Sequence, residues 1–307
     1  MALKRLLVLG GSGFIGRNLS EVARDAGYSV TALSLKPAAA EIRGVRHLCA
    51  DLGDTASLAA ALGKAQFEYV VNSAGYIDHR LFQNGGRALL HSHFDGVQNL
   101  IERLDRDCLT RFVQLGSSDE YGSAAAPQRE NLRECPISPY SLAKLATTQL
   151  LQMLWRTEKF PAVTLRLFLT YGPGQDHKRF LPQIISGCIE DKTFPVSGGL
   201  QLRDFCHVQD ITCGILHALE ATNVCGEVIN LASGTPVSIR AVIEQVQKMV
   251  GKGIPEFGKI PLRAGENPGL YADIEKARAL LDWKPTYTLA DGLQNTINFY
   301  RGHVGTS

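Results

Sequence analysis

The chain has 307 residues, 45% of them hydrophobic, and a formal net charge of +2. This length and apolar content suffice for a large core in one two-lobed unit or in two domains. The near-neutral charge gives no indication of a nucleic-acid-binding surface, and no apolar segment is long enough to span a membrane. The apolar run after Lys4-Arg5 is too short for a signal peptide.

Seven cysteines are present, an odd number, and no two of them are spaced Cys-x-x-Cys. This usage indicates reduced thiols in a cytoplasmic protein rather than a disulfide framework or a zinc site. The other candidate metal ligands are His79, His91 and His93. We expect no metal there, because His91 and His93 are two residues apart and point to different faces of a helix.

Residues 6–16 predict a nucleotide-binding turn. An apolar run over 6–9 is typical of a strand buried on both faces, and a helical pattern follows it. The glycines between them fit the demands of a dinucleotide: a tight turn, close approach of backbone to pyrophosphate, and close helix–strand packing. Backbone N–H groups and the helix dipole would hold the phosphates. The alternative is a glycine turn without a ligand. The candidate cofactor residues are Gly10, Gly11, Ser12, Gly13, Phe14, Ile15 and Gly16.

A second strand over residues 29–33 leads to Ser34. In a nucleotide-binding unit this strand tip faces the adenosine ribose, where an acidic residue would hold the 2′-hydroxyl of NAD. The sequence has Ser34 and Lys36 there and no carboxylate. A hydroxyl and a cation suit a 2′-phosphate, so we expect NADP as cofactor, with NAD as the second choice. The alternative for Lys36 is a solvated loop lysine.

The next two strands place further candidates at the same edge. The third, over residues 45–50, is followed by a carboxylate that can accept a hydrogen bond from the adenine amino group, although an isolated aspartate there is more often a turn former. The fourth, over residues 67–71, is followed by small residues over which a cofactor can lie flat. The candidate cofactor residues here are Asp51, Leu52, Ala74 and Gly75.

Residues 110–115 form a fifth strand, and residues 116–122 after it are rich in hydroxyls and carboxylates. Polar groups at a buried strand tip are costly unless they are paired, and ligands of open α/β sheets bind at that edge. The candidate catalytic residues of this stretch are Ser117, Ser118 and Asp119.

Ser138 and Pro139 predict a helix start, with Ser138 as N-cap and Pro139 at the first helical position. Tyr140 and Lys144, four residues apart, then share one face of that helix. A free tyrosine titrates near ~10, and a nearby ammonium favours the phenolate, so we expect Lys144 to lower the pKa of Tyr140. Such a phenol is a general acid or base towards a hydroxyl or carbonyl. The alternative is a surface pair.

Together these motifs resemble the extended short-chain dehydrogenase/reductases, and within them the branch that modifies nucleotide-activated sugars. The similarity rests on the glycine turn, Asp51-Leu52, Ser117 and Tyr140-x-x-x-Lys144. It continues in three later stretches: Tyr171-Gly172-Pro173-Gly174, Arg203-Asp204-Phe205-Cys206-His207-Val208-Gln209-Asp210, and Asp282-Trp283-Lys284-Pro285. It covers nearly the whole chain, and the motifs are specific jointly rather than singly.

The resemblance implies an α/β fold, a Rossmann-type doubly wound parallel sheet with a smaller, interwoven C-terminal substrate lobe. We expect a dinucleotide-binding domain made of residues 1–172 with 204–235. The nucleotide-sugar lobe would comprise residues 173–203 with 236–307, and the substrate would lie between the two.

The resemblance also implies residue roles. Tyr140 would be the acid/base, Lys144 would bind the nicotinamide ribose and tune Tyr140, and Ser117 would hydrogen-bond the reacting oxygen. A guanidinium fork suits the phosphate oxygens of a nucleotide-diphosphate sugar. The alternative for Arg203 is a structural pair with Asp204 or Asp210. The candidate substrate residues are Arg203, Arg263 and Arg179.

Two positions depart from the family pattern. Leu169 stands where members usually carry a substrate-binding asparagine, and leucine cannot donate a hydrogen bond. His93 stands where many members have asparagine. Both changes bear on the sugar more than on the fold.

The remaining chain predicts a strand over 227–231 that returns to the main sheet, and helices over 86–104, 179–189, 211–219, 239–250, 275–281 and 289–300. The apolar faces of 86–104 and of the helix after Ser138 predict a homodimer. The alternative is that these faces pack only on the sheet.

We therefore expect an NADP-dependent reductase of a nucleotide-linked 4-keto-6-deoxy sugar. Ser118 falls where many dehydratases of the family carry an acid, and Asp119 falls where they carry the glutamate that removes the C5 proton. A shorter arm counts against elimination, because a base must reach its proton. One alternative is a 4-epimerase or 4,6-dehydratase that retains NAD. Another is a nucleotide-sensing or scaffold protein, which has no need of the Ser117, Tyr140 and Lys144 set.

Overall fold

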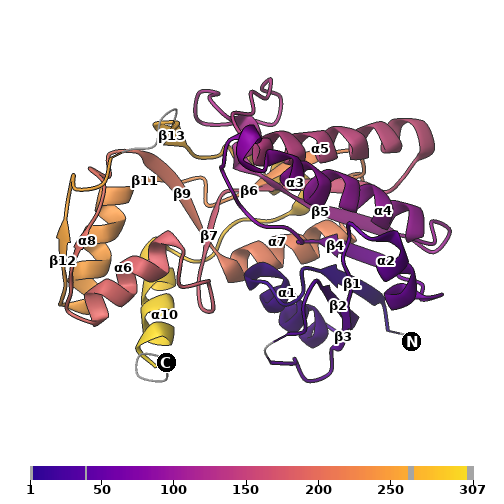
Figure 1. The fold of residues 1–307 in the computed structure, drawn as a ribbon, viewed down its shortest axis with the longest axis horizontal. Helices are drawn as coiled ribbons and strands as arrows, with labels where there is room; N and C mark the ends of the chain where they lie inside the picture. Colours follow the sequence, from indigo (N-terminus) through magenta and orange to yellow (C-terminus); the bar gives the residue numbers. More distant parts are fainter. Residues whose placement is uncertain (1–2, 39, 262–265, 303–307) are drawn as a thin grey trace.

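The computed structural model describes residues 3–38, 40–261 and 266–302, and it forms two lobes side by side (Figure 1). The larger lobe contains a seven-stranded sheet with helices on both faces, and the smaller lobe contains two smaller sheets and, within these described residues, three helices. This is the α/β, Rossmann-like architecture that the sequence predicts.

The large sheet is parallel throughout and is ordered β10-β6-β5-β4-β1-β2-β3. The order reverses between β1 and β4, and at such a point the crevice beyond the strand ends binds ligands in doubly wound folds. The predicted strand over 227–231 does return to this sheet and pairs with β6. The strands are β1 (Arg5–Leu9), β2 (Ser29–Ser34), β3 (Arg46–Cys49), β4 (Tyr69–Asn72), β5 (Arg111–Ser117), β6 (Ala162–Leu167) and β10 (Val228–Leu231).

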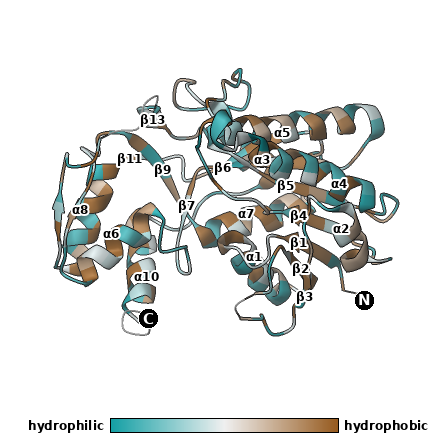
Figure 2. Cartoon of the chain, viewed as in Figure 1, coloured by the Kyte–Doolittle hydropathy of each residue, from teal (hydrophilic) through white to brown (hydrophobic). Residues whose placement is uncertain are grey.

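The two faces of this sheet pack into separate apolar clusters. In β1, Leu6 and Val8 face one cluster while Leu7 and Leu9 face the other, so the strand is buried on both sides as its apolar run predicts. Figure 2 shows these strands as hydrophobic and the outer helical surfaces as more hydrophilic. One face carries α1 (Phe14–Asp25), α7 (Val208–Glu220) and α9 (Glu275–Leu281); the other carries α2 (Thr55–Leu62), α4 (Gly96–Arg103) and α5 (Pro139–Glu158).

The helix predicted over residues 86–104 is not continuous. It divides into α3 (Gly86–Leu90), a π-helical turn at His91–Asp95 and α4. A π turn inserts one residue into the helical repeat, and such turns are frequent at functional sites. Here it buries His93 while His91 stays exposed, so the two histidines do face different directions.

The smaller lobe is built from stretches that are far apart in the chain. One sheet joins β7 (Leu169–Tyr171), β9 (Leu202–His207), β11 (Pro236–Ser238) and β13 (Gly269–Leu270), and a second pairs β8 (Thr193–Pro195) with β12 (Ile254–Glu256). Its helices are α6 (Phe180–Ile189), α8 (Ile239–Val250) and α10 (Leu289–Arg301). Their apolar faces share one cluster that also contains Tyr171 and Phe205. The chain therefore leaves this lobe for α7 and β10 and then returns to it.

Candidate active site

Glycines of the turn between β1 and α1 lie where the structure has no room for a side chain. A Cβ on Gly16 would lie 2.2 Å from the carbonyl oxygen of Gly10, and one on Gly11 would lie 2.5 Å from the Cβ of Ala32. Gly10 also has a φ of +72°, which favours glycine. The turn thus presents backbone without side chains at the point where the strand order of the sheet reverses. No side chain caps the start of α1, because its N-cap is Gly13. These features fit the pyrophosphate of a dinucleotide.

The tip of β2 holds Ser34 with its hydroxyl turned to the glycine turn. The Ser34 Oγ accepts a hydrogen bond of 2.8 Å from the backbone N–H of Ser12. Lys36 is exposed beyond it. A second cation that sequence reasoning missed also reaches this loop, since Arg17 Nη1 donates to the Ala40 carbonyl at 3.0 Å. The ribose end of the predicted cofactor site therefore carries a hydroxyl and two cations.

The other predicted cofactor residues lie along the same sheet edge. Asp51 is exposed and its carboxylate accepts the N–H of Gly53 at 2.8 Å, so it does form a turn. The Leu52 carbonyl accepts from Asn99 of α4 at 2.8 Å. Ala74 and Gly75 follow β4, and a Cβ on Gly75 would lie 2.1 Å from the His93 ring. A side chain at position 75 would therefore clash with His93, and it would also fill the space over the strand end where the cofactor is expected.

Ser117, Tyr140 and Lys144 come together at the tip of β5. Ser138 does cap α5, with Pro139 at its first position, and Tyr140 and Lys144 share one face of the helix. The Ser117 side chain lies close enough to the Tyr140 hydroxyl to affect its pKa. The Lys144 Nζ donates to the Leu115 carbonyl at 3.0 Å. All three side chains are nearly buried.

The expectation that Lys144 lowers the pKa of Tyr140 is wrong in this structure. Burial raises the pKa of Tyr140 well above its ordinary value, the Asp119 carboxylate adds to the rise, and the Ser117 side chain opposes it. The Lys144 ammonium turns to a backbone carbonyl, and burial lowers its own pKa to about 8 against the opposing effect of Glu120. Tyr140 is therefore protonated and ready to act as an acid.

His93 is part of the wall behind Tyr140. Its ring meets the Tyr140 ring edge to face, with 5.2 Å between centroids, and its Nε2 lies 2.9 Å from the Tyr76 carbonyl oxygen. That carbonyl can only accept, so Nε2 carries the proton. Burial, helped by the Lys144 charge, lowers the pKa of His93 to about 3. His93 is a neutral imidazole at physiological pH.

Asp119 does not stand alone at the site. Its carboxylate lies 2.8 Å from Nε2 of His79, whose ring also packs edge-on against Tyr140 at 5.9 Å between centroids. Ser118 is buried at the start of the 3-10 turn η3 (Ser118–Tyr121). The pairing of His79 with Asp119 joins residues 40 positions apart, and nothing in the sequence pattern indicates it.

The substrate arginines have different surroundings. Arg203 Nη2 lies 2.5 Å from a Glu266 carboxylate oxygen, so this arginine does form a structural pair, with Glu266. Arg179 is the N-cap residue of α6. Its positive charge lowers the pKa of Tyr140, so Arg179 lies near the site. Arg263 lies outside the described residues. Leu169 is 40% exposed at the start of β7.

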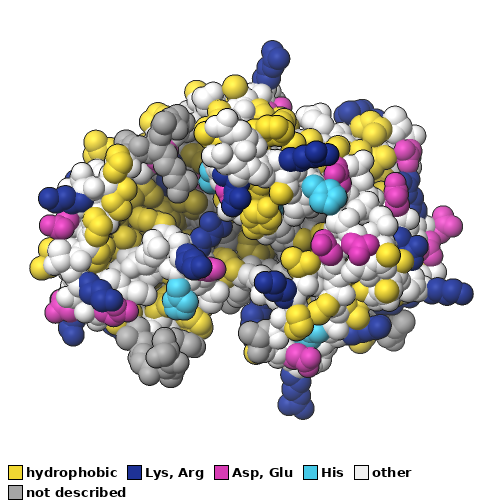
Figure 3. Space-filling view, in the orientation of Figure 1, with side chains coloured by type: hydrophobic (Ala, Val, Ile, Leu, Met, Phe, Trp, Pro, Cys, Tyr) yellow, Lys and Arg dark blue, Asp and Glu magenta, His cyan; other side chains and the backbone are white. Residues whose placement is uncertain are grey.

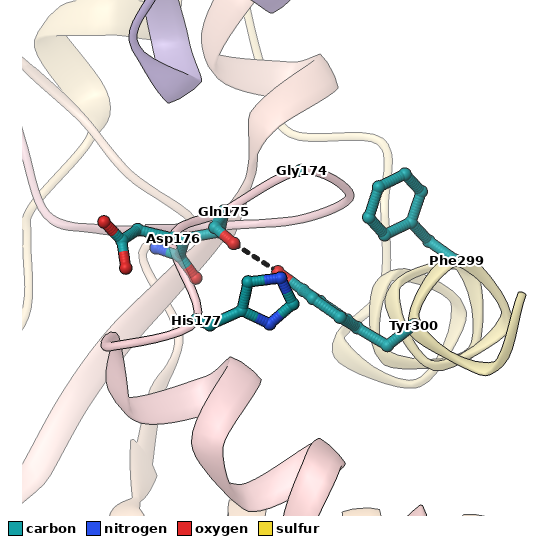
Figure 4. Close-up of a pocket in the computed structure, with 6 residues that line it drawn as sticks. All are labelled: Gly174, Gln175, Asp176, His177, Phe299 and Tyr300. Carbon is teal, nitrogen blue, oxygen red and sulfur yellow. Dashed lines mark hydrogen bonds between the residues drawn. The ribbon is translucent and has the colours of Figure 1, made fainter. Parts of the chain in front are cut away.

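Between the two lobes the surface is hollowed, with Lys and Arg side chains at the margin (Figure 3). A separate open pocket of about 370 Å³ lies between the 174–177 loop and α10, where the Tyr300 hydroxyl donates to the Gln175 carbonyl at 2.5 Å (Figure 4). None of the candidate site residues lines this pocket.

Two classes of feature are absent from the described part of the chain. Over residues 3–38, 40–261 and 266–302, no group of three or more His, Cys, Asp and Glu side chains is arranged to hold a metal ion. Within the same ranges, no helix combines the length and apolar character needed to cross a membrane.

Known proteins resemble this chain over nearly its whole length. It is 28% identical to an uncharacterized UDP-glucose epimerase of Bacillus subtilis (strain 168), with 96% of this chain and 97% of the relative covered. It is also 28% identical to a dTDP-glucose 4,6-dehydratase of Streptomyces niveus, with 97% and 93% covered.

A solved structure agrees with these sequence relatives. The UDP-glucuronic acid 4-epimerase of Bacillus cereus, in complex with UDP-glucuronic acid and NAD, superposes with a TM-score of 0.85 at 28% identity, with 97% of this chain and 99% of that chain covered. Residues 6–232 match the model of the NAD dependent epimerase/dehydratase family. The glycine turn, the Ser117–Tyr140–Lys144 cluster and this match over most of the chain lead to one assignment: the protein belongs to the NAD-dependent epimerase/dehydratase family.

Proposed function

We propose that this enzyme reduces the 4-keto group of a nucleotide-linked 4-keto-6-deoxy sugar, using NADP. The observation that carries the proposal is the buried Tyr140 beside Asp119, whose short carboxylate occupies the position of the dehydratase base but is paired with His79. A reduction needs a proton donor at the carbonyl oxygen and no base at the C5 proton.

Tyr140, Ser117 and Lys144 each have a separate role in the proposed reduction. The nicotinamide, when bound, supplies the hydride to the sugar carbonyl carbon. Tyr140 gives its proton to the oxygen, and the Ser117 hydroxyl hydrogen-bonds that oxygen as negative charge develops on it. Lys144 holds the nicotinamide ribose. Because burial raises the pKa of Tyr140, the phenol keeps its proton until the oxygen becomes basic.

The other acidic side chain of the turn is unsuited to the elimination that a dehydratase performs. Glu120 is fully buried and paired with Arg166. Asp119 has one methylene fewer than the glutamate of dehydratases, and its Oδ2 is 2.8 Å from His79 Nε2. A base must come within about 2.6–3.2 Å of its proton, directly or through one water. This arrangement favours reduction over dehydration.

NADP is supported by the charges around the tip of β2. Ser34 replaces the acid that would hold a 2′-hydroxyl, and Lys36 and Arg17 bring cations to the loop that follows. A reductase must exchange its nicotinamide in each cycle, whereas an epimerase or dehydratase retains it. The relative from Bacillus cereus contains NAD, which makes NAD the cofactor to compare.

The nucleotide-diphosphate sugar is proposed to lie between the lobes. Arg203 and Arg179 are the described cations suited to its diphosphate, and Arg263 remains a prediction from the sequence. The homodimer, the cytoplasmic location and the exact domain limits also remain predictions. On α5, Leu142 and Met153 are exposed apolar residues that a dimer would cover.

The test is turnover with a panel of nucleotide-linked 4-keto-6-deoxy sugars. We expect purified protein without tightly held cofactor, and consumption of one NADPH for each sugar reduced. Protein that retains NAD and converts a nucleotide hexose without net oxidation of added cofactor would be an epimerase or dehydratase. Tight nucleotide binding with no turnover of any kind would favour the sensing or scaffold alternative.

A further inference from the structure

Glu120 is a fully buried carboxylate directly behind the candidate active site. It lies in η3, three residues after Ser117, and none of its surface is exposed. A charged side chain is rarely buried completely unless it is paired, because the loss of hydration is costly. Its partners therefore show what the burial achieves.

The Glu120 carboxylate contacts three separate elements. Its Oε1 accepts the backbone N–H of Ser117 at the tip of β5, at 2.8 Å. Its Oε2 accepts the Thr148 hydroxyl of α5 at 2.9 Å and the Nε of Arg166 in β6 at 2.9 Å. One side chain thus joins the strand tip, the helix and the neighbouring strand.

Thr148 lies on the helical face that carries Tyr140 and Lys144. Tyr140, Lys144 and Thr148 recur every four residues of α5, so they stack along one side. Glu120 accepts hydrogen bonds from both Thr148 and the Ser117 backbone, and it therefore holds that side of α5 close to Ser117. Gly116 leaves space for this contact, because a Cβ there would lie 2.5 Å from the Glu120 Oε1.

We propose that Glu120 is a positioning residue, which sets the distance between Ser117 and the Tyr140–Lys144 face of α5 and balances the charge of Lys144. The inference rests on the proposed roles of these three residues and not on the identity of the sugar. Glu120 itself does not touch the reacting atoms.

The charges around Lys144 support the second part of the inference. Lys144 faces Tyr140 of its own helix, the neutral His93 of the π turn, the Leu115 carbonyl of β5 and Glu120 of η3. Arg166 also bonds to Glu134, at 2.7 Å. Glu120 thus lies between two cations: Arg166, which it contacts directly, and Lys144, which lies one helical turn from its partner Thr148 and whose pKa it raises.

Four substitutions separate the possible roles. Thr148→Val removes the hydroxyl that α5 gives to Glu120 without altering any charge, and Thr148→Ser keeps it as the control. Glu120→Gln removes the buried charge at nearly constant shape. Glu134→Gln removes the other carboxylate of Arg166, which contacts neither Ser117 nor α5 in the bonds above, and is the matched charge control.

Two measurements on the protein without sugar report the effects directly. Hydrogen exchange measures protection of the Ser117 amide. NMR of lysine labelled with carbon-13 next to the ammonium follows the titration of Lys144, which stands apart from ordinary lysines because its pKa is about 8. The Lys144 signal is assigned by its loss in Lys144→Met. Turnover is then measured with whichever sugar the panel identifies.

We expect Glu120→Gln to lower the Ser117 protection and to move the Lys144 titration to lower pH, because the charge that raises the pKa of Lys144 is lost. Thr148→Val should leave that titration in place and lower kcat by about tenfold, with KM unchanged, since small misplacements of reacting groups have effects of this size or larger. Thr148→Ser and Glu134→Gln should resemble the parent protein in each of these properties.

Three results would overturn the inference: an unchanged Lys144 titration in Glu120→Gln, an equal shift in Glu134→Gln, or normal kcat in Thr148→Val. If Glu120→Gln does not fold, the comparison of Thr148→Val with Thr148→Ser still tests the link between Glu120 and α5. If the reductase assignment fails but the Lys144 titration and Ser117 exchange change as expected, the positioning role stands and only the proposed reaction is wrong.

Discussion

The imidazole of His93 packs edge-on against the phenol ring of Tyr140, with 5.2 Å between the ring centroids. His93 donates from Nε2 to a backbone carbonyl and lies near the Lys144 ammonium, so a charge on the imidazole is strongly disfavoured. The ring of Tyr140, the proposed acid, thus packs against a histidine that the fold keeps neutral. Keeping His93 neutral makes the free energy of unfolding depend on pH.

The folded protein holds the pKa of His93 at about 3, below the unfolded value of about 6.5. As pH falls below the unfolded value, the unfolded chain binds the proton first, and the free energy of unfolding decreases. Between about pH 7.5 and about pH 5, the parent protein should lose about 2 kcal/mol more than His93→Asn in urea denaturation. Equal losses in the two proteins would show that His93 becomes protonated in the fold.

Tyr140→Phe keeps the ring and its packing on His93 and His79 but removes the proton that the hydroxyl donates. General acid catalysis is worth roughly 10²–10⁴-fold, so turnover should fall by about that factor. The NADPH affinity should change little, because the ring still fills its place. Steady-state kinetics and a fluorescence titration test both parts. Near-normal turnover would exclude Tyr140 as the acid.

The cofactor preference should reside at the tip of β2. Ser34→Asp places a carboxylate where the hydroxyl now accepts the Ser12 N–H, and like charge would repel a 2′-phosphate. We expect this variant to shift preference from NADPH towards NADH. Arg17→Ala should weaken NADPH more than NADH, because only NADPH carries the extra phosphate. Tighter binding of NADH than NADPH by the parent protein would contradict the NADP assignment.

Gly16→Ala should damage the cofactor site through the backbone. The new Cβ would lie 2.2 Å from the Gly10 carbonyl oxygen, which cannot rotate away as a side chain can. We expect NADPH affinity to fall by about tenfold or more, equivalent to about 1.4 kcal/mol. Gly198→Ala is the control, because no atom lies within 4 Å of a Cβ at that position. Normal NADPH binding by Gly16→Ala would show that the turn does not contact the cofactor.

The sequence was sufficient for those parts of the fold that depend on local pattern. The apolar run of β1 and the glycines after it define a strand, a turn and a helix within a few residues, and Ser138-Pro139 defines the start of α5. The face shared by Tyr140 and Lys144 follows from helical geometry alone. These predictions needed no information about distant residues.

Electrostatics at the site depended on residues that the fold brings from elsewhere. The pKa of Tyr140 rises because of burial and the carboxylates of η3, which helical spacing from Lys144 does not reveal. Arg203 pairs with Glu266, 63 positions away, while the neighbouring Asp204 and Asp210 accept backbone N–H groups of other loops. The π turn at His93 has no sequence signal comparable to a proline or a glycine.

The interleaving of the two lobes has a consequence for how the protein forms during synthesis. The large sheet is complete once β10 (Val228–Leu231) has left the ribosome, whereas β7, α6 and β9 emerge earlier and must wait for α8 and α10 to bury their apolar faces. Domains tend to fold in the order of synthesis. The smaller lobe therefore closes its core last, on a nascent chain whose nucleotide-binding sheet already exists.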